Sequence, residues 1–297
     1  MRAMRIKLNI LIITIIIILY SFHINAFGFN NSIVQNADFS NQYINDVLYE
    51  YMQSIGLHEG NFSLGYYNIL TGEEYLYNPD KFMVAASLYK LPLCMAYTDH
   101  INAGEMFLDD KVGGYNLGYA IAQSIQYSNN DTALALKRAF GDSYHTEIAK
   151  YSGLDMSEFP SIYYSYNRLS SRFMLNTLKY LYENQSQYQS IIEYMKLANR
   201  GEYFDKAGID YLVAQKYGVY HPEYNCSAIV YTNYPFLLVA FANEIGYAER
   251  GLAGLCELFT KYTEYTQWLY MYNLSNRLYT YLDTKYLNIE NLTNPSN

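Results

Sequence analysis

Ser87 and Lys90 lie in an apolar, helix-prone run, VAASLYKLPL, and their types and spacing could carry out nucleophilic chemistry. Three residues are close to one helical turn, so both side chains lie on the same face of a helix. A serine hydroxyl is a weak nucleophile at neutral pH, and a lysine amine whose pKa is lowered by burial or nearby positive charge can accept its proton. The pair therefore predicts a buried serine nucleophile with lysine as its base.

An ordinary surface pair on an amphipathic helix is the alternative interpretation, because a single short motif produces false matches. Two observations favour the chemical one. Among the serines of the chain, only Ser87 has a lysine three residues later, and the flanking residues are apolar, as expected for the start of a buried helix. The first turn of such a helix can also direct backbone N–H groups at a developing oxyanion.

Periodicity predicts the elements that must position this pair. A helix around residues 45–55 precedes two extended runs, NFSLGYYNIL and EEYLYNP, which Thr71-Gly72 joins as a hairpin. The stretch from about Val84 to Arg200 is mostly helical. Three short strands follow, YLVAQKYGVY, CSAIVYTNY and FLLVAFANE, and the chain is helical from Ala248 onward.

The five predicted strands are expected to form one sheet, because an isolated hairpin is only marginally stable. The predicted fold is α/β of the α+β type, a five-stranded antiparallel sheet with flanking helices and an inserted all-helical lobe. We expect one two-lobed domain over residues 27–297. Its sheet lobe covers about 45–80 and 205–297, and its helical lobe covers about 81–204. A site is expected in the cleft between the lobes.

The N-terminus has the layout of a secretory signal. Arg2, Arg5 and Lys7 precede an apolar run from Leu8 to Tyr20, and a small residue follows at position 26. We therefore expect residues 1–26 to be a signal peptide and the protein to be secreted or extracytoplasmic. An uncleaved N-terminal membrane anchor is the alternative.

Composition excludes several classes of protein. The formal net charge is −8 and no basic block interrupts it, so nucleic acid is excluded as a partner. Cys94, Cys226 and Cys256 form no C-x-x-C pair, so neither a zinc knuckle nor a dense disulfide framework is expected. Each cysteine is interpreted as a small buried apolar side chain, with one disulfide pair left open.

Two more motifs follow the S-x-x-K motif in order. Ser128-Asn129-Asn130 reads S-x-N after an apolar helix, and Lys216-Tyr217-Gly218 reads K-x-G at the start of the strand series. The ordered triplet resembles the class A β-lactamases and penicillin-binding proteins over roughly Phe62 to Cys256. Two rivals rank lower: Ser165-Tyr166-Asn167 lies in an irregular stretch, and Lys206-Ala207-Gly208 lacks a following strand pair.

The resemblance implies a β-lactamase/transpeptidase-like fold and a role for each matched residue. Ser87 would be acylated, with Lys90 as proton acceptor or as a stabiliser of that acceptor. Ser128 would relay a proton to the leaving nitrogen, and Asn130 would hydrogen-bond the substrate amide. Lys216 would bind the substrate carboxylate and lower the pKa of Lys90. Substrate contacts are also expected at the three residues that follow it, Tyr217, Gly218 and Val219, with the backbone N–H groups of Ser87 and Val219 as the oxyanion hole.

The chain departs from the family pattern at several positions. The E-x-x-L-N loop, whose glutamate activates water in class A enzymes, is absent. Glu158 lies in the comparable region, but Ile162 stands where asparagine is expected, so Glu158 is either the deacylation base or a solvated loop residue. Tyr217 replaces a small hydroxyl residue and could reshape the cleft. Cys94 occupies a disulfide position of some class A enzymes, but its usual partner position is Ile121.

The function expected from the resemblance is that of a secreted serine hydrolase that opens the β-lactam ring through a Ser87 acyl-enzyme. One alternative is a penicillin-binding or D-Ala-D-Ala peptidase-like protein with slow deacylation. Another is a catalytically retired protein that binds the cell wall on the same fold. The expected partner is a small-molecule β-lactam or a peptidoglycan-stem-like substrate, with no metal or organic cofactor, membrane contact only through the N-terminal segment, and a monomeric chain. The Tyr-rich tail from Tyr262 to Asn297 stays unassigned.

Overall fold

The computed structural model describes residues 31–165, 167–243 and 248–293 of the 297-residue chain. The predicted signal or anchor segment, residues 1–26, lies outside this range, so both it and the secreted location remain predictions. No helix within the described range is both long enough and apolar enough to cross a membrane.

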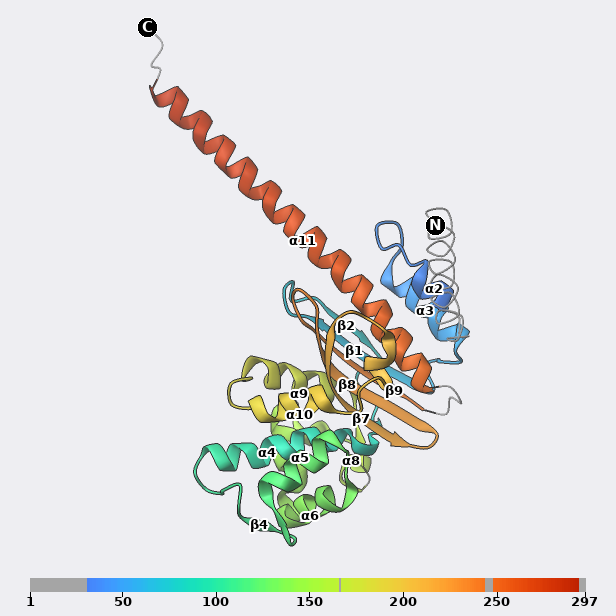
Figure 1. Ribbon diagram of the computed structural model, residues 1–297. Coiled ribbons are helices and arrows are strands. Elements are labelled where there is room, and N and C mark those ends of the chain that lie inside the picture. The colour runs from blue at the N-terminus through green and yellow to red at the C-terminus, as the bar shows by residue number, and fades with distance from the viewer. Residues whose placement is uncertain (1–30, 166, 244–247, 294–297) are drawn as a thin grey trace, which may run out of the picture.

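A single five-stranded antiparallel sheet forms the centre of the molecule, in the order β2-β1-β9-β8-β7. Figure 1 shows the sheet between a lobe of short helices and the long helix α11. This confirms the predicted fold class, with the two N-terminal strands beside the three C-terminal ones. The strands are β1 (Phe62–Asn68), β2 (Glu74–Tyr77), β7 (Leu212–Tyr220), β8 (Glu223–Tyr231) and β9 (Phe236–Ala242).

The predicted hairpin at Thr71-Gly72 joins β1 to β2. Gly72 adopts φ +73°, a left-handed conformation that glycine reaches without steric cost. The Asn68 side chain accepts hydrogen bonds from the backbone N–H groups of Leu70 and Thr71 at 3.1 and 3.3 Å. Local turn chemistry therefore sets the register of this pair.

Each face of the sheet packs against a different core. Along β7, Val213 packs in the core under α11, whereas Ala214 packs in the core of the helical lobe. Because side chains alternate along a strand, Lys216 and Gly218 lie on the same face as Ala214. The lysine and the glycine of the third motif therefore face the helical lobe, which contains Ser87.

The helical lobe lies between β2 and β7 in the sequence, as predicted. Its central helix, α4, has nine consecutive buried residues, 90–98, as expected for a helix enclosed on all sides. A short antiparallel pair, β3 (Met83–Val84) with β6 (Arg168–Leu169), ties the segment before Ser87 to the end of the lobe. The described α-helices of this lobe are α4 (Lys90–Asn102), α5 (Leu117–Gln126), α6 (Asn130–Phe140), α7 (Tyr144–Ala149), α8 (Ser161–Ser165), α9 (Ser171–Glu183) and α10 (Gln189–Leu197).

Shorter elements complete the described structure. The strands β4 and β5 form a small hairpin next to α5, and α2 and α3 pack beside α11 on the other side of the sheet. The bounds are α2 (Asn31–Gln35), α3 (Ile44–Ser54), β4 (Lys111–Val112), β5 (Tyr115–Asn116) and, for the 3₁₀ turns, η1 (Ala86–Tyr89), η2 (Gly141–Ser143), η3 (Lys150–Ser152), η4 (Met156–Glu158) and η5 (Tyr203–Ala207).

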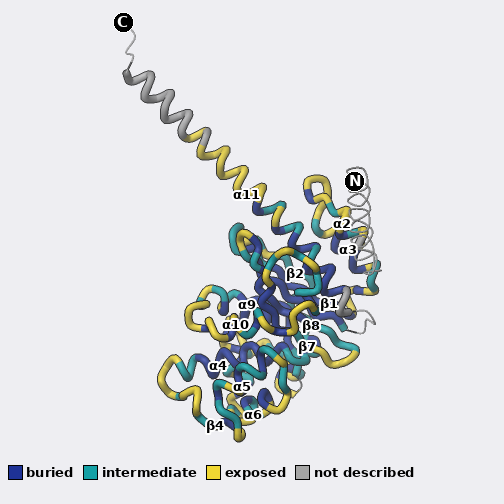
Figure 2. The backbone as a smooth tube through the Cα atoms, in the orientation of Figure 1, coloured by how far each residue is buried: buried dark blue, intermediate teal, exposed yellow. Residues whose placement is uncertain are grey.

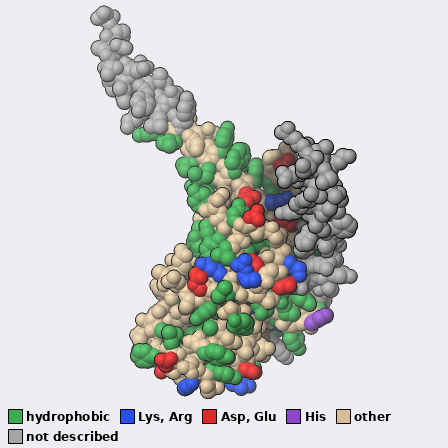
Figure 3. Space-filling model, viewed as in Figure 1, with side chains coloured by type: hydrophobic (Ala, Val, Ile, Leu, Met, Phe, Trp, Pro, Cys, Tyr) green, Lys and Arg blue, Asp and Glu red, His purple; other side chains and the backbone are tan. Residues whose placement is uncertain are grey.

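The C-terminal helix α11 (Ala248–Thr293) has two different halves. Its first part packs on the sheet through Leu255, Cys256 and Phe259, which are fully buried. From Trp268 onward the described side chains are exposed, and the helix projects from the body (Figures 1 and 2). Hydrophobic side chains gather on this projecting part (Figure 3). The tail that the sequence left unassigned, from Tyr262 onward, therefore contains only the end of the packed part, with Thr263 and Gln267 buried, and its remaining described side chains, from Trp268 onward, are exposed.

All three cysteines are free thiols with fully buried side chains. Burial raises the pKa of Cys94 and of Cys226 to about 12, so both thiols stay protonated at neutral pH. The interpretation as small apolar core residues is confirmed, and the disulfide pair left open by the sequence is not formed.

The two halves of α11 predict opposite responses to truncation of a large side chain. Phe259→Ala should lower the free energy of unfolding by about 3–5 kcal/mol, because a buried aromatic ring leaves a cavity. Trp268→Ala, nine residues later and 60% exposed, should change it by no more than about 0.5 kcal/mol. Urea unfolding followed by circular dichroism measures both, and an equal loss in the two variants would contradict the division.

Candidate active site

Ser87 lies in the 3₁₀ turn η1, directly before α4 begins at Lys90. Asn167, a residue outside the S-x-x-K motif, stabilises this turn through hydrogen bonds. Ala86 adopts φ +48°, and its carbonyl accepts a hydrogen bond from the Asn167 side chain. The backbone N–H of Ala85 donates to the carbonyl of Asn167 at 3.0 Å. Asn167 therefore clamps the backbone on the N-terminal side of Ser87.

Lys90 is fully buried, and its ammonium group points at the S-x-N motif. Its Nζ donates to the Ser128 carbonyl at 2.6 Å and to Asn130 Oδ1 at 2.7 Å, with Ser128 Oγ at 3.3 Å. These three acceptors use the full donor capacity of a protonated lysine. Lys90 therefore fastens the first motif to the second.

The S-x-N motif occupies the corner between α5 and α6. Ser128 adopts φ +53°, and Asn129 is the N-cap of α6. The Asn129 side chain accepts hydrogen bonds from the backbone N–H groups of Asp131 and Thr132 at 2.9 and 3.1 Å. The middle residue thus starts the helix, which leaves Ser128 and Asn130 to face the site.

Lys216 reaches the same serine from the sheet. Its Nζ donates to Ser128 Oγ at 3.0 Å and to the Tyr217 carbonyl at 2.7 Å, and its side chain is fully buried. The Ser128 hydroxyl therefore receives hydrogen bonds from two lysines, one from each lobe. The structure brings together Lys90, Ser128, Asn130 and Lys216, at the start of the helix that follows Ser87.

Burial lowers the pKa of both lysines. The pKa of Lys90 falls to about 8, with loss of solvation as the largest cause. The pKa of Lys216 lies well below its ordinary value, first because of burial and second because of the charge on Lys90. The charge on Lys90 thus lowers the pKa of Lys216, whereas burial, and not the expected charge of Lys216, accounts for the lowered pKa of Lys90.

Gly218 provides the close approach between sheet and nucleophile. A Cβ atom at this position would lie 2.7 Å from the Ala85 carbonyl oxygen and 2.8 Å from the backbone nitrogen of Ser87. No real Cβ contact is that short, so only glycine permits this packing. On the neighbouring strand β8, Asn225 pairs with Gly218 and donates to the Val84 carbonyl at 2.8 Å.

Tyr217 turns to the other face of β7. Its ring stacks on Tyr203, with centroids 4.5 Å apart and an interplanar angle of 9°, and Lys216 Nζ lies 4.3 Å from its centroid. It is not among the described residues that line the cleft at Ser87. The Lys216 ammonium group therefore lies over the Tyr217 ring, and a cation in this position is stabilised by the aromatic face.

A cleft of about 460 Å³ opens at Ser87. Of the predicted substrate-binding residues, Asn130 and Val219 are among the described lining residues and Tyr217 and Gly218 are not. Arg168 is the one charged side chain among the described lining residues. Arg168 Nε is buried without a hydrogen-bond partner in the structure. The lining consists of Val84, Ala86, Ser87, Tyr89, Asn130, Leu134, Asn167, Arg168, Val219 and Tyr220.

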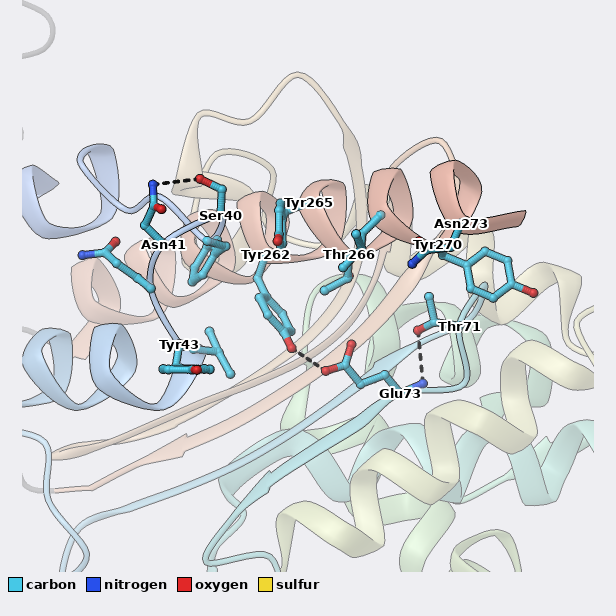
Figure 4. A pocket seen from close by; sticks show the side chains of 14 residues that line it. Ser40, Asn41, Tyr43, Thr71, Glu73, Tyr262, Tyr265, Thr266, Tyr270 and Asn273 are labelled. Carbon is cyan, nitrogen blue, oxygen red and sulfur yellow. Dashed lines mark hydrogen bonds between the residues drawn. The ribbon is translucent and has the colours of Figure 1, made fainter. Parts of the chain in front are cut away.

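Glu158 lies outside this lining. It ends the 3₁₀ turn η4 with its side chain exposed, and no aspartate or glutamate is among the described residues that line the cleft. A second hollow, of about 620 Å³, lies between residues 39–44, the β1–β2 turn and α11 (Figure 4). It contains no serine–lysine pair, so the Ser87 cleft is the candidate active site.

Sequence comparison decides the family. Residues 41–253 match the model of the β-lactamase enzyme family, which covers all three motifs and most of the described fold. The chain belongs to the β-lactamase enzyme family. The expected resemblance is thereby confirmed for family and fold.

Solved β-lactamases have the same fold at low sequence identity. The last common ancestor of Gram-negative bacteria β-lactamase class A superposes with a TM-score of 0.63 at 19% identity, over 73% of this chain and 98% of that one. A β-lactamase from Chitinophaga pinensis gives 0.62 at 17% identity, over 73% and 97%. No curated protein sequence matches the chain.

The structure adds three residues to the site of this β-lactamase family member. Asn167 and Asn225 hold the backbone before Ser87, and Arg168 lines the cleft. The sequence offered one signal for the first of them, the lower-ranked S-x-N match that ends at Asn167. Neither Arg168 nor Asn225 belongs to a motif, because each reaches the site through strand pairing with residues far along the chain.

Gly218→Ala adds a single methyl group, but it should lower the free energy of unfolding substantially. The added methyl group meets backbone atoms, so we expect a loss of about 1–3 kcal/mol in the free energy of unfolding. Val219→Ala, at the adjacent position that is 38% exposed, should change it by no more than about 0.5 kcal/mol. Urea titration of both variants is the measurement, and a Gly218→Ala variant as stable as the wild type would refute the close approach.

Proposed function

We propose that this chain is a serine hydrolase that opens the β-lactam ring through an acyl-enzyme at Ser87. The observation that supports it most is the convergence of two buried lysines on the Ser128 hydroxyl, at the start of the helix that follows Ser87. Buried amines with lowered pKa values suit proton transfer near neutral pH. Membership in the β-lactamase enzyme family supports the same substrate class.

The proposed acylation moves one proton along this set of residues. The neutral amine of Lys90 accepts the proton of the Ser87 hydroxyl as Oγ attacks the lactam carbonyl carbon. The carbon–nitrogen bond of the ring then breaks, and the nitrogen takes the proton of the Ser128 hydroxyl. Ser128 recovers a proton from the lysines that hydrogen-bond to it. The acyl group remains on Ser87, and no proton is lost overall.

Charge that develops on the carbonyl oxygen is proposed to be stabilised by backbone N–H groups of Ser87 and Val219. The contact of Gly218 with the Ser87 backbone supports this assignment, because it brings the strand and the turn together without an intervening side chain. Arg168, which lines the cleft, and Lys216, which lies behind it at Ser128, are proposed to supply positive charge for an anionic substrate group. Asn130, another lining residue, is proposed to bind the substrate amide.

A penicillin-binding protein with slow deacylation is the second candidate, and one observation favours it. Hydrolysis of the acyl-enzyme requires a base for water, and no carboxylate lies among the described lining residues of the cleft. Glu158, the proposed deacylation base, would have to reach the cleft from an exposed position. We also propose that the chain acts outside the cytoplasm, on the strength of its N-terminal segment.

Benzylpenicillin should form a covalent adduct on Ser87. Intact-protein mass spectrometry, sampled from seconds to hours, should show the mass of one penicillin added to the wild type. Ser87→Ala should show none, because no other serine has the lysine base. Ser165→Ala, which removes the exposed serine of the rival S-x-N match, is the matched control and should label like the wild type.

The lifetime of the adduct separates the two candidates. An adduct that clears as penicilloate accumulates, and that persists in Glu158→Gln, establishes a β-lactamase with Glu158 as deacylation base. An adduct that persists in both proteins establishes a penicillin-binding protein. Labelling of Ser87→Ala, or no adduct on the wild type with any β-lactam, would refute acylation at Ser87.

The rate of adduct formation should rise with pH. Below the Lys90 pKa of about 8, the amine is mostly protonated and cannot accept the Ser87 proton, so the rate should rise about tenfold per pH unit and level off above 8. Lys90→Arg should lose labelling, since arginine stays charged. Lys196→Arg, on the surface of α10, is the control. A flat profile between pH 6 and 9 would exclude Lys90 as the base.

A further inference from the structure

The second hollow is built from three segments that are far apart in the sequence. One wall is formed by residues 39–44, the floor by Thr71 and Glu73 of the β1–β2 connection, and the other wall by residues 262–273 of α11 (Figure 4). We name it the Glu73 groove. Its volume of about 620 Å³ is that of a small-molecule site.

Glu73 is the only charged residue among the described residues that line the groove. One carboxylate oxygen, Oε1, accepts a hydrogen bond from the Tyr262 hydroxyl. The other oxygen, Oε2, has no hydrogen-bond or ion-pair partner among the described residues, and no lysine, arginine or histidine lines the groove. The negative charge at its centre is therefore uncompensated, which favours a cation as ligand.

Tyrosine rings make up much of the remaining surface. Tyr43 is 79% exposed and Tyr270 is 43% exposed, whereas Tyr262 and Tyr265 are partly buried. The faces of such rings are electron-rich and attract ammonium groups, with about 0.5–1 kcal/mol per contact at exposed sites. Amide and hydroxyl groups from Asn41, Gln42, Thr71, Thr266 and Asn273 complete the lining.

The carboxylate is held in position before any ligand arrives. The backbone N–H of Glu73 donates to Thr71 Oγ1 at 3.2 Å, and its carbonyl accepts from the backbone N–H of Asn68 at 2.9 Å. The Tyr262 ring that binds its side chain packs edge-on against Phe39, with centroids 5.2 Å apart. Preorganised groups lose less entropy on binding.

We propose that the Glu73 groove binds a small organic cation, a primary or quaternary ammonium compound, with Glu73 as counter-ion and the tyrosine rings around the charged head. The groove lies on the α11 side of the sheet, whereas Ser87 faces the helical lobe. Binding is therefore independent of acylation at Ser87, and each can fail without the other.

Choline and its neutral isostere 3,3-dimethylbutan-1-ol test the charge requirement on the wild-type chain. Trp268 is the only tryptophan and lies 6.2 Å from the Tyr265 ring, so its fluorescence reports on the groove. We expect saturable binding of choline by fluorescence or by isothermal titration calorimetry. The neutral isostere should bind at least fivefold more weakly.

Glu73→Gln provides the second arm, since it removes the charge and keeps the shape and the acceptor for Tyr262. Choline affinity should fall at least fivefold in this variant and stay unchanged in Glu50→Gln, an exposed glutamate of α3 outside the groove. Absence of saturable choline binding by both methods would overturn the proposal. Equal affinity for choline and its isostere, or tighter binding of a neutral sugar such as N-acetylglucosamine, would also overturn it.

Discussion

The shared hydrogen bond of two buried lysines to one serine hydroxyl is the interaction around which this molecule is organised. Lys90 comes from the central helix α4, Lys216 from the edge strand β7, and Ser128 from the corner between α5 and α6. Burying a charged amine is costly unless hydrogen-bonding groups replace water. Lys90 finds its acceptors within the helical lobe, whereas Lys216 reaches Ser128 only when the helical lobe is docked on the sheet. The same burial lowers both pKa values, which connects the stability of the fold to its proposed chemistry.

The docking of the lobes also depends on residues that have no part in the proposed proton transfers. Gly218 lets the sheet approach the backbone of Ser87, and the side-chain amides of Asn167 and Asn225 bind the carbonyls of Ala86 and Val84. These contacts hold a turn in which Ala86 adopts a positive φ angle. Backbone conformations of that kind persist where the surroundings over-determine them, and they concentrate at functional sites.

The chain has the fold of its family, and two of its departures from the expected family pattern are Tyr217 and Glu158. At 17–19% identity, the chain has the fold of solved β-lactamases over 73% of its length, and its three motifs lie within the residues that match the family model. The changes lie at the edges of the site, where Tyr217 turns away to stack on Tyr203 and Glu158 lies exposed. In the proposed reaction, the residues assigned to acylation therefore lie at or directly behind the Ser87 cleft, whereas Glu158, the proposed deacylation base, lies outside its described lining.

The sequence by itself determined the elements and the order of the motifs, because strand alternation, helix periodicity and turn residues are local signals. It predicted the five-stranded sheet, the inserted helical lobe and the buried cysteines. Only the tertiary structure decided that Lys90 and Lys216 share Ser128, that Asn167 and Arg168 belong at the cleft, and that α11 leaves the body after Gln267. Those facts are set by strand pairing and lobe docking between residues far apart in the chain, on which local spacing carries no information.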